Sequence, residues 1–200
     1  MYSEKKIKDY LDDLSSNAHI PGGGSCVPLL GALANSVACF VLNLSVNRKK
    51  YAHLKEKLVA VREKTEKLQS GFLPLIDRDN EILEQILSAC KNPEIAEPEM
   101  NRIIENAISF SLQICEMCIE SLKAGLEIAN IGNRMLSSDV EIIAYIGDAA
   151  LNSSISNIKI NIGSLKDEEY RKTVRDKCLS LRTEGENLKR KIIETVDLNI

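Results

Sequence analysis

Apolar residues recur at helical spacing along nearly the whole chain. Near the N-terminus they fall at Ile7, Tyr10, Leu11 and Leu14, and steps of one, three and four residues place them on one helical face. No segment alternates between apolar and polar residues over the length of a strand. The pattern therefore predicts an all-α protein whose first helix covers residues 2–16.

Turn and capping signals divide the remainder into long helices. Gly71 and Pro74 are expected to kink or interrupt one of them, and S-x-x-E and S-x-x-D signals at Ser138 and Ser164 are typical of helix starts. The expected helices run over residues 26–46, 51–70, 75–90, 99–130, 138–163 and 164–194. Long helices joined by short loops predict a single domain over residues 1–200, folded as one antiparallel bundle.

Residues 26–46 form a stretch of 21 residues without a charge, which is long enough to span a bilayer. The stretch contains Asn35, and Gly31, Ala34 and Ala38 recur at helical spacing, which lets other helices approach closely. We therefore expect a small-residue-rich helix at the centre of the bundle, with a membrane anchor as the alternative. Amphipathic neighbours cover such a helix incompletely, so we also expect a homodimer or an assembly of dimers.

Composition narrows the function classes. The 26 basic and 29 acidic residues give a net charge of −3, and aromatic residues make up 4%, which argues against nucleic-acid binding. The N-terminus lacks the features of a signal peptide, and six cysteines are too sparse for a disulfide scaffold. These observations favour a cytoplasmic protein. Cys115 and Cys118 form a lone C-x-x-C, interpreted as buried thiols in preference to a metal or redox site.

The most informative local feature is the loop Pro21-Gly22-Gly23-Gly24-Ser25. Three glycines before a long helix leave backbone amides free at the positive end of the helix dipole. Such a turn can receive a carboxylate, an oxyanion or a flat heterocycle. It matches neither the Walker A loop nor the dinucleotide-binding glycine motif. A flexible turn capped by Ser25 is the alternative.

Further motifs follow this loop along the chain. They are Gly31-Ala32-Leu33, Asn43-Leu44, Lys49-Lys50-Tyr51, Leu75-Ile76-Asp77-Arg78-Asp79, Ser138-Asp139-Val140, Ala149-Ala150-Leu151, Asn157-Ile158-Lys159-Ile160-Asn161 and Leu165-Lys166-Asp167. Together and in this order they resemble the cyclodeaminase/cyclohydrolase family over about residues 5–195. The resemblance implies folate one-carbon chemistry centred on 5,10-methenyltetrahydrofolate, with a tetrahydrofolate derivative as substrate and no metal or redox cofactor.

Two reactions are known in that family, and the sequence holds no residue that separates them. In the cyclodeaminase reaction, N10 attacks the formimino carbon of 5-formiminotetrahydrofolate and ammonia departs. In the cyclohydrolase reaction, water opens the methenyl bridge to give 10-formyltetrahydrofolate. Both pass through a tetrahedral carbon between two nitrogens, so proton transfer is the step that an enzyme assists. We place the cyclodeaminase first, with the cyclohydrolase and a non-catalytic helical binding or scaffold protein as alternatives.

Three aspartates are the candidate acid-base groups: Asp77, Asp79 and Asp139. Asp77 and Asp79 are two residues apart and therefore about 200° apart around a helix. Asp77 falls in register with the apolar Leu73 and Ile76, so we expect Asp77 to face the cleft. Asp139 lies at a predicted helix start, where a carboxylate is favoured electrostatically in any case.

The candidate substrate-binding residues are Gly22, Gly23, Gly24, Ser25, Lys49, Lys50, Tyr51, Asn157, Lys159 and Asn161. The adjacent lysines are expected to meet the glutamate tail of a folate, and the tyrosine to offer its ring to the flat ring system. Capping of the preceding helix by the same lysines is the alternative. The two asparagines are amides that need partners when buried, and Lys159 between them is a candidate for orienting an anionic substrate.

Overall fold

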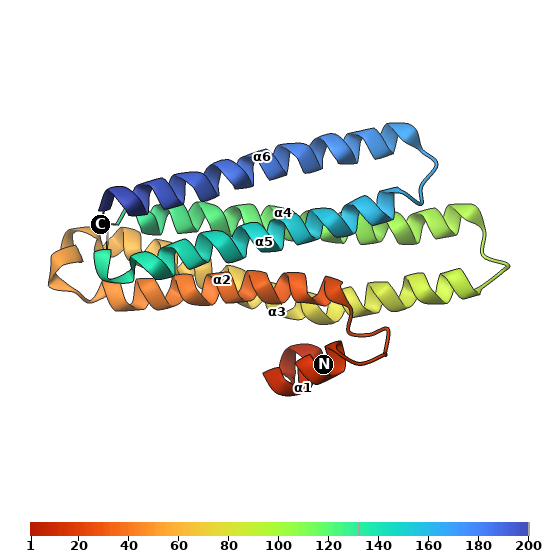
Figure 1. The fold of residues 1–200 in the computed structure, drawn as a ribbon, viewed down its shortest axis with the longest axis horizontal. Coiled ribbons are helices and arrows are strands. Elements are labelled where there is room, and N and C mark those ends of the chain that lie inside the picture. The colour runs from red at the N-terminus through yellow and green to blue at the C-terminus, as the bar shows by residue number, and fades with distance from the viewer. Residues whose placement is uncertain (132, 200) are drawn as a thin grey trace.

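The computed structural model describes residues 1–131 and 133–199, and the regular structure in these residues is helical throughout. Five long helices lie side by side and alternate in direction (Figure 1). They are α2 (Gly23–Val46), α3 (Lys55–Lys91), α4 (Glu97–Ala129), α5 (Ser137–Ile162) and α6 (Glu168–Asn199). The expectation of an all-α antiparallel bundle is confirmed.

Helix α2 packs against three of the other long helices, α3, α4 and α5. Its small residues allow the close approach. A Cβ atom added at Gly31 would lie 2.5 Å from the ring of Phe72 on α3. The buried Asn35 side chain donates hydrogen bonds to the Gly31 carbonyl at 2.9 Å and to the hydroxyl of Ser121 on α4 at 2.8 Å. The expected small-residue-rich helix within the bundle is therefore confirmed.

Burial of α2 is incomplete. Within the described residues, α2 is the one helix whose length and composition would allow it to cross a membrane, and 61% of its most apolar window is buried by the rest of the bundle. A helix in the core of a soluble protein can have the same length and apolar composition. On the uncovered side, Leu33, Phe40 and Leu44 are exposed.

Helix α3 differs from its prediction because it runs without interruption through Gly71 and Pro74. Pro74 is exposed, so the carbonyl that loses its helical partner four residues earlier can bond to water. Phe72 and Ile76 on either side of the proline are buried, and this packing outweighs the roughly 3 kcal/mol by which proline disfavours a helix. Residues 51–54, expected to begin this helix, belong to a 3-10 segment, η2 (Lys49–Leu54).

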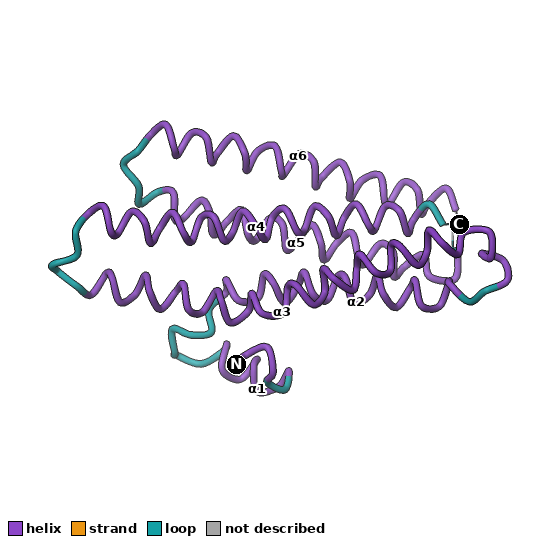
Figure 2. Tube along the Cα trace, turned by 180° about the vertical axis from the view of Figure 1, so that it is seen from behind, coloured by secondary structure: helices purple, strands orange, loops and turns teal. Residues whose placement is uncertain are grey.

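The N-terminal region also differs from the single helix expected over residues 2–16. It forms a 3-10 turn, η1 (Tyr2–Glu4), and a short helix, α1 (Ile7–Leu14). Of the apolar face predicted for it, only Tyr10 is buried, whereas Ile7 and Leu11 are exposed. Figure 2, seen from behind, shows α1 outside the bundle, as does Figure 1.

Two predicted helix starts shift by a few residues. Helix α5 begins at Ser137 directly after a 3-10 turn, η3 (Arg134–Leu136), without a side-chain cap, so the capping signal at Ser138 is unused. At α6 the cap is supplied by Asp167, whose Oδ1 accepts a hydrogen bond from the Tyr170 amide at 2.9 Å.

The thiols of the C-x-x-C pair are buried on α4. Burial raises the pKa of Cys115 to about 12 and raises that of Cys118 as well. In the part of the chain that the structure describes, no three His, Cys, Asp or Glu side chains are grouped to hold a metal ion. The burial of both thiols fits the interpretation of this pair as buried thiols.

Candidate active site

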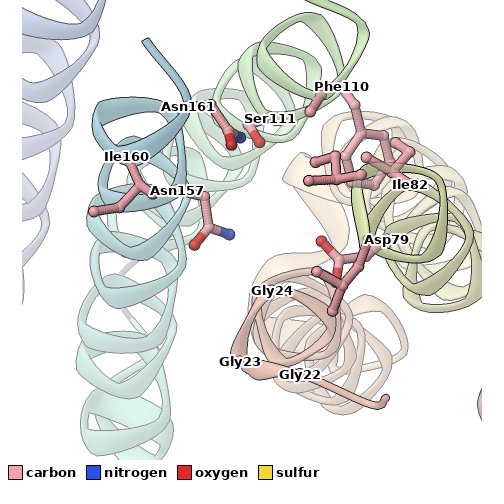
Figure 3. Close-up of a pocket in the computed structure, with 13 residues that line it drawn as sticks. Gly22, Gly23, Gly24, Asp79, Ile82, Phe110, Ser111, Asn157, Ile160 and Asn161 are labelled. Atoms are coloured by element: carbon pink, nitrogen blue, oxygen red, sulfur yellow. The ribbon is translucent and has the colours of Figure 1, made fainter. Parts of the chain in front are cut away.

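A cavity of about 260 Å³ lies where the N-terminus of α2 meets α3, α4 and α5 (Figure 3). An aspartate from α3 stands on one side, two asparagines from α5 stand on the other, and most of the remaining side chains are apolar. The lining residues are Gly22, Gly23, Gly24, Asp79, Ile82, Leu83, Ile86, Ala107, Phe110, Ser111, Asn157, Ile160 and Asn161. The fold thus places the glycine-rich loop, one member of the aspartate pair and the two asparagines of α5 around one cavity.

The glycine-rich loop forms the first turn of α2, with Gly22 as the N-cap residue. Ser25 is therefore not the cap. Its buried hydroxyl donates a hydrogen bond to the Gly22 carbonyl at 2.8 Å and lies 2.8 Å from the hydroxyl of Tyr10. Ser25 and Tyr10 hold the loop from behind, and Ser25 does not line the cavity.

The absence of a side chain at Gly24 lets the Asp79 carboxylate pack directly against the turn. A Cβ atom at Gly24 would lie 2.4 Å from Oδ1 of Asp79, whereas one at Gly23 would meet nothing within 4 Å. The first amides of a helix have no partner inside the helix and carry partial positive charge. The turn therefore offers hydrogen-bond donors and open space to a ligand next to the Asp79 carboxyl.

Asp79 is the titratable group of this cavity. Burial raises its pKa from 3.8 to about 6. Within residues 1–131 and 133–199, no hydrogen bond or ion pair engages its carboxyl oxygens. A carboxyl with free oxygens and a pKa close to neutrality is suited to both giving and taking a proton.

Asp77, expected to face the cleft, faces the N-terminal segment. Its carboxylate accepts hydrogen bonds from the Tyr2 amide and from the Ser3 hydroxyl and amide. Burial acts to raise the pKa of Asp77, but these hydrogen bonds outweigh it and lower the pKa. The prediction was wrong because it took Leu73 as an inward residue, whereas Leu73 is exposed. The face of α3 that lines the cavity is instead the one that includes Asp79.

The asparagines of α5 are placed as expected, but the lysine between them is not. Asn157 and Asn161 are one turn apart and both line the cavity. Lys159 lies on the opposite side of α5, where it faces Arg175 and Arg182 of α6. Two residues correspond to about 200° of rotation in a helix, so Lys159 cannot share the face of the two amides.

The remaining candidates lie at the other end of the bundle. Lys49, Lys50 and Tyr51 follow the C-terminus of α2, whose 24 residues span about 36 Å at 1.5 Å per residue. Tyr51 is buried, and Lys50 lies over its ring. Asp139 is in the first turn of α5, whereas the asparagines are near its last turn. Within one chain, these four residues do not reach the cavity.

Sequence reasoning missed the contribution of α4. Phe110 and Ser111 line the cavity, but they sit in an ordinary amphipathic pattern without any local motif. Tyr10 contacts the glycine-rich loop from behind, but the sequence pattern assigned it only to the apolar face of a helix. Such contacts join residues far apart in the chain, so no short-range signal identifies them.

Two relatives of this chain match it over most of its length. A methenyltetrahydrofolate cyclohydrolase of Methylorubrum extorquens is 27% identical over 203 residues, which cover 98% of each chain. A formimidoyltransferase-cyclodeaminase of Rattus norvegicus is 21% identical over 189 residues, which cover 91% of this chain and 35% of the rat protein. The chain thus spans about a third of that longer relative.

The fold has a close counterpart among solved structures. The crystal structure of a formiminotetrahydrofolate cyclodeaminase from Thermotoga maritima matches with a TM-score of 0.92 at 21% sequence identity, with 98% of both chains covered. Residues 6–180 match the sequence model of the formiminotransferase-cyclodeaminase family. Since that match covers most of the chain, the protein belongs to the formiminotransferase-cyclodeaminase family of folate one-carbon enzymes.

Proposed function

We propose that the Asp79 cavity binds the pterin end of 5-formiminotetrahydrofolate and converts it to 5,10-methenyltetrahydrofolate and ammonia. The observation that carries the proposal is the half-buried Asp79 carboxyl, with free oxygens and a pKa of about 6, beside the glycine-rich turn. The family membership supplies the class of substrate.

The dimensions and walls of the cavity suit a bicyclic ring. Its volume of about 260 Å³ is below the roughly 300–1,000 Å³ of sites for larger ligands, so the tail of a folate would extend out of it. Ile82 and Phe110 offer apolar surface to the faces of the ring. The amides of Asn157, Asn161 and the glycine-rich turn offer hydrogen bonds to its polar edge.

In the proposed reaction, N10 of the protonated substrate forms a bond to the formimino carbon, which becomes tetrahedral. The Asp79 carboxylate takes the proton from N10. The resulting carboxylic acid then gives this proton to the departing amino group, the bond from carbon to that nitrogen breaks, and ammonia leaves. The positive charge of the substrate stays on the methenyl product, and Asp79 ends as it began. The chemistry uses proton transfer alone.

The cyclohydrolase reaction is the second candidate. It is favoured by the 27% identity to a cyclohydrolase over nearly the full length of both chains. Here the Asp79 carboxylate would take a proton from the water that attacks the methenyl carbon. It would return the proton to N5 as the bond from that nitrogen to carbon breaks, and the remaining hydroxyl proton would pass to solvent as the formyl C=O forms, which removes the positive charge of the methenyl substrate.

Two absorbance assays separate these candidates. Purified protein is mixed with 5-formiminotetrahydrofolate, and the near-ultraviolet band of the methenyl product and free ammonia are followed together. In a second assay, loss of supplied methenyltetrahydrofolate is followed. Formation of product and ammonia above the uncatalysed rate supports the cyclodeaminase, catalysis only in the second assay supports the cyclohydrolase, and no catalysis in either supports the scaffold alternative.

An aspartate pair supplies the matched variants for these assays. Asp79→Asn should lower kcat by about 10²–10⁴-fold, the usual contribution of a general acid-base. Asp77→Asn makes the same change two residues away, outside the cavity, and should retain most of the turnover. Equal activity in Asp79→Asn and the unaltered protein would remove Asp79 from the mechanism.

We further propose that the uncovered face of α2 pairs with the same face of a second copy. Leu30, Leu33, Val37, Phe40 and Leu44 recur at alternating steps of three and four residues, the spacing of a helix–helix seam. Three of the five are exposed and the other two are half-buried. Pairing between copies accounts for the apolar character of α2 in a cytoplasmic protein, and cell fractionation tests that location.

An antiparallel two-fold pairing of α2 would also reunite the separated candidate residues. The glycine-rich turn and the Lys49–Lys50 pair lie at opposite ends of α2. Pairing about the middle of the helix would therefore bring Lys49 and Lys50 of the second copy near the Asp79 cavity. Their positive charges would complement the carboxylates of a folate tail that extends from it.

Active-site complementation tests this arrangement. Asp79→Asn and the double variant Lys49→Glu/Lys50→Glu should each be poorly active alone. When the two are mixed and allowed to exchange subunits, heterodimers contain one site with both changes and one site with neither, so activity should reappear. Sedimentation should show a dimer that Phe40→Glu converts to a monomer. No recovery in mixtures shown to contain heterodimers would refute the shared site.

A further inference from the structure

A second cavity, of about 170 Å³, lies between α5 and α6. It is on the opposite side of α5 from the Asp79 cavity, because it is reached by Lys159 and not by the two asparagines. Three basic side chains line it, those of Lys159, Arg175 and Arg182, together with apolar side chains such as Ile162 and Leu179. No acidic residue is among the described residues that line this basic α5–α6 cavity.

The positive charges in this cavity are largely uncompensated. In residues 1–131 and 133–199, no ion pair engages Lys159 or Arg182. Arg175 lies 3.9 Å from Glu168, and the other oxygen of that carboxylate is already paired with Arg171. Lys159 and Arg175 are exposed, so water and salt screen part of the repulsion among the three cations. An anion in the cavity would offset the remainder.

Lys159 of α5 and Arg182 of α6 line the cavity together with the thiol of Cys178. Burial raises the pKa of Cys178, which also lines the cavity, while the positive charges of Arg182 and Lys159 act to lower it. The two cations therefore lie close enough to the thiol to affect it, although they come from different helices. They converge on the space between α5 and α6.

Arg182 is held in place by a chain of polar contacts. Its Nε donates a hydrogen bond to Oδ1 of Asn152 at 3.2 Å, and Nδ2 of Asn152 donates to Oδ1 of Asp148 at 3.1 Å. Asp148 is in turn paired with Lys189. This series of hydrogen bonds uses the Nε–H of the Arg182 guanidinium and leaves its terminal nitrogens for a ligand. An arginine positioned in this way is suited to bidentate contact with a carboxylate or phosphate.

We propose that the basic α5–α6 cavity binds a compact organic dianion, either a phosphate monoester or a dicarboxylate. A dianion offsets most of the charge of Lys159, Arg175 and Arg182, whereas a monoanion leaves two charges uncompensated. The apolar wall formed by Ile162 and Leu179 accommodates a short carbon skeleton. The site is separate from the proposed folate site, since the two cavities use different faces of α5.

Isothermal titration of the full chain with inorganic phosphate, and separately with succinate, at constant ionic strength tests the proposal. Saturable binding of at least one probe is expected. Tighter binding of phosphate would identify the ligand as a phosphate monoester, and tighter binding of succinate as a dicarboxylate. The loss of one charge-assisted contact should weaken binding at least about tenfold in Arg182→Gln and in Lys159→Gln.

Lys172→Gln is the matched control, because Lys172 is an exposed cation on α6 outside the cavity lining. It should bind both probes as the unaltered protein does. Lys159→Gln leaves the Asn152 contact intact, so it keeps the test decisive if Arg182→Gln unfolds. Heat that does not saturate, or equal weakening in Lys172→Gln and Lys159→Gln, would overturn the proposal. All three variants should retain folate turnover if that function is correct, so the two proposals fail separately.

Discussion

Replacing Asp79 with asparagine should stabilise the fold at neutral pH while it removes turnover. The carboxyl is half-buried in the cavity wall, and this burial raises its pKa from 3.8 to about 6. Between these two pH values the folded protein holds a proton that the unfolded chain has released. The folded state of the unaltered protein therefore loses stability as the pH rises through this interval, and above pH 6 the full cost of the buried charge is present.

The size of the effect follows from the shift. A change of about two pKa units corresponds to about 3 kcal/mol of unfavourable free energy at neutral pH, at 1.36 kcal/mol per unit. An asparagine amide in the same place has its own partly unmet hydrogen bonds, which cost about 1–3 kcal/mol. We expect Asp79→Asn to gain up to about 2 kcal/mol at pH 8, which raises Tm by at most roughly 5 °C for a domain of this size.

Urea unfolding of Asp79→Asn and the unaltered protein at pH 4 and pH 8 measures this quantity. The advantage of the variant should be present at pH 8 and absent or reversed at pH 4, where the aspartate is protonated in the fold and the cost of the asparagine amide remains. Asp77→Asn is the control of opposite sign, because the pKa of Asp77 is lowered in the fold. That variant should be less stable than the unaltered protein at pH 8, and the difference should shrink as the pH falls through the acidic range.

Two results would refute this reasoning. A gain from Asp79→Asn that is equal at pH 4 and pH 8 would mean that the carboxyl does not titrate differently in the folded and unfolded states. A loss of stability at pH 8 would mean that its charged form is stabilised by the fold, as an ion pair or hydrogen bond would do. Either result would remove the basis for Asp79 as a group that exchanges protons near neutral pH.

Three further substitutions probe the same architecture. Gly24→Ala should lower kcat at least tenfold because its Cβ would displace the Asp79 carboxyl, whereas Gly23→Ala should keep kcat and raise KM; equal kinetics in both would contradict the contact. Tyr10→Phe should lower stability by about 1 kcal/mol through loss of the hydrogen bond to the buried Ser25, and an unchanged urea midpoint would show that this bond does not contribute. Phe72→Ala should cost about 3–5 kcal/mol because the fully buried ring fills the space beside a glycine; thermal unfolding within 1 °C of the unaltered protein would exclude tight packing there.

Periodicity along the chain determined most of the secondary structure. An uncharged stretch with small residues at helical spacing predicts a helix that packs closely against several others, and α2 packs against α3, α4 and α5. The glycine-rich loop was also recognisable as a place where another group can approach the backbone closely, because three consecutive glycines carry no side chains. These inferences succeed because they depend on neighbours within one or two helical turns.

Local signals failed where distant packing opposed them. Gly71 and Pro74 do not end α3 because buried residues on both sides hold the helix together. The N-terminal segment does not form one helix because its first amides bond to Asp77 on α3. In each case the competing contact comes from residues far away in the chain, which periodicity cannot represent.

Only the tertiary structure decided which aspartate faces the cavity and what lies opposite it. Asp77 and Asp79 differ by two positions, so a small error in the assumed inward face exchanges their roles. Burial then raises the pKa of Asp79, while hydrogen bonds from the N-terminal segment lower that of Asp77. Residue type and spacing determined the candidates, and the packing of four helices around one cavity determined their chemistry.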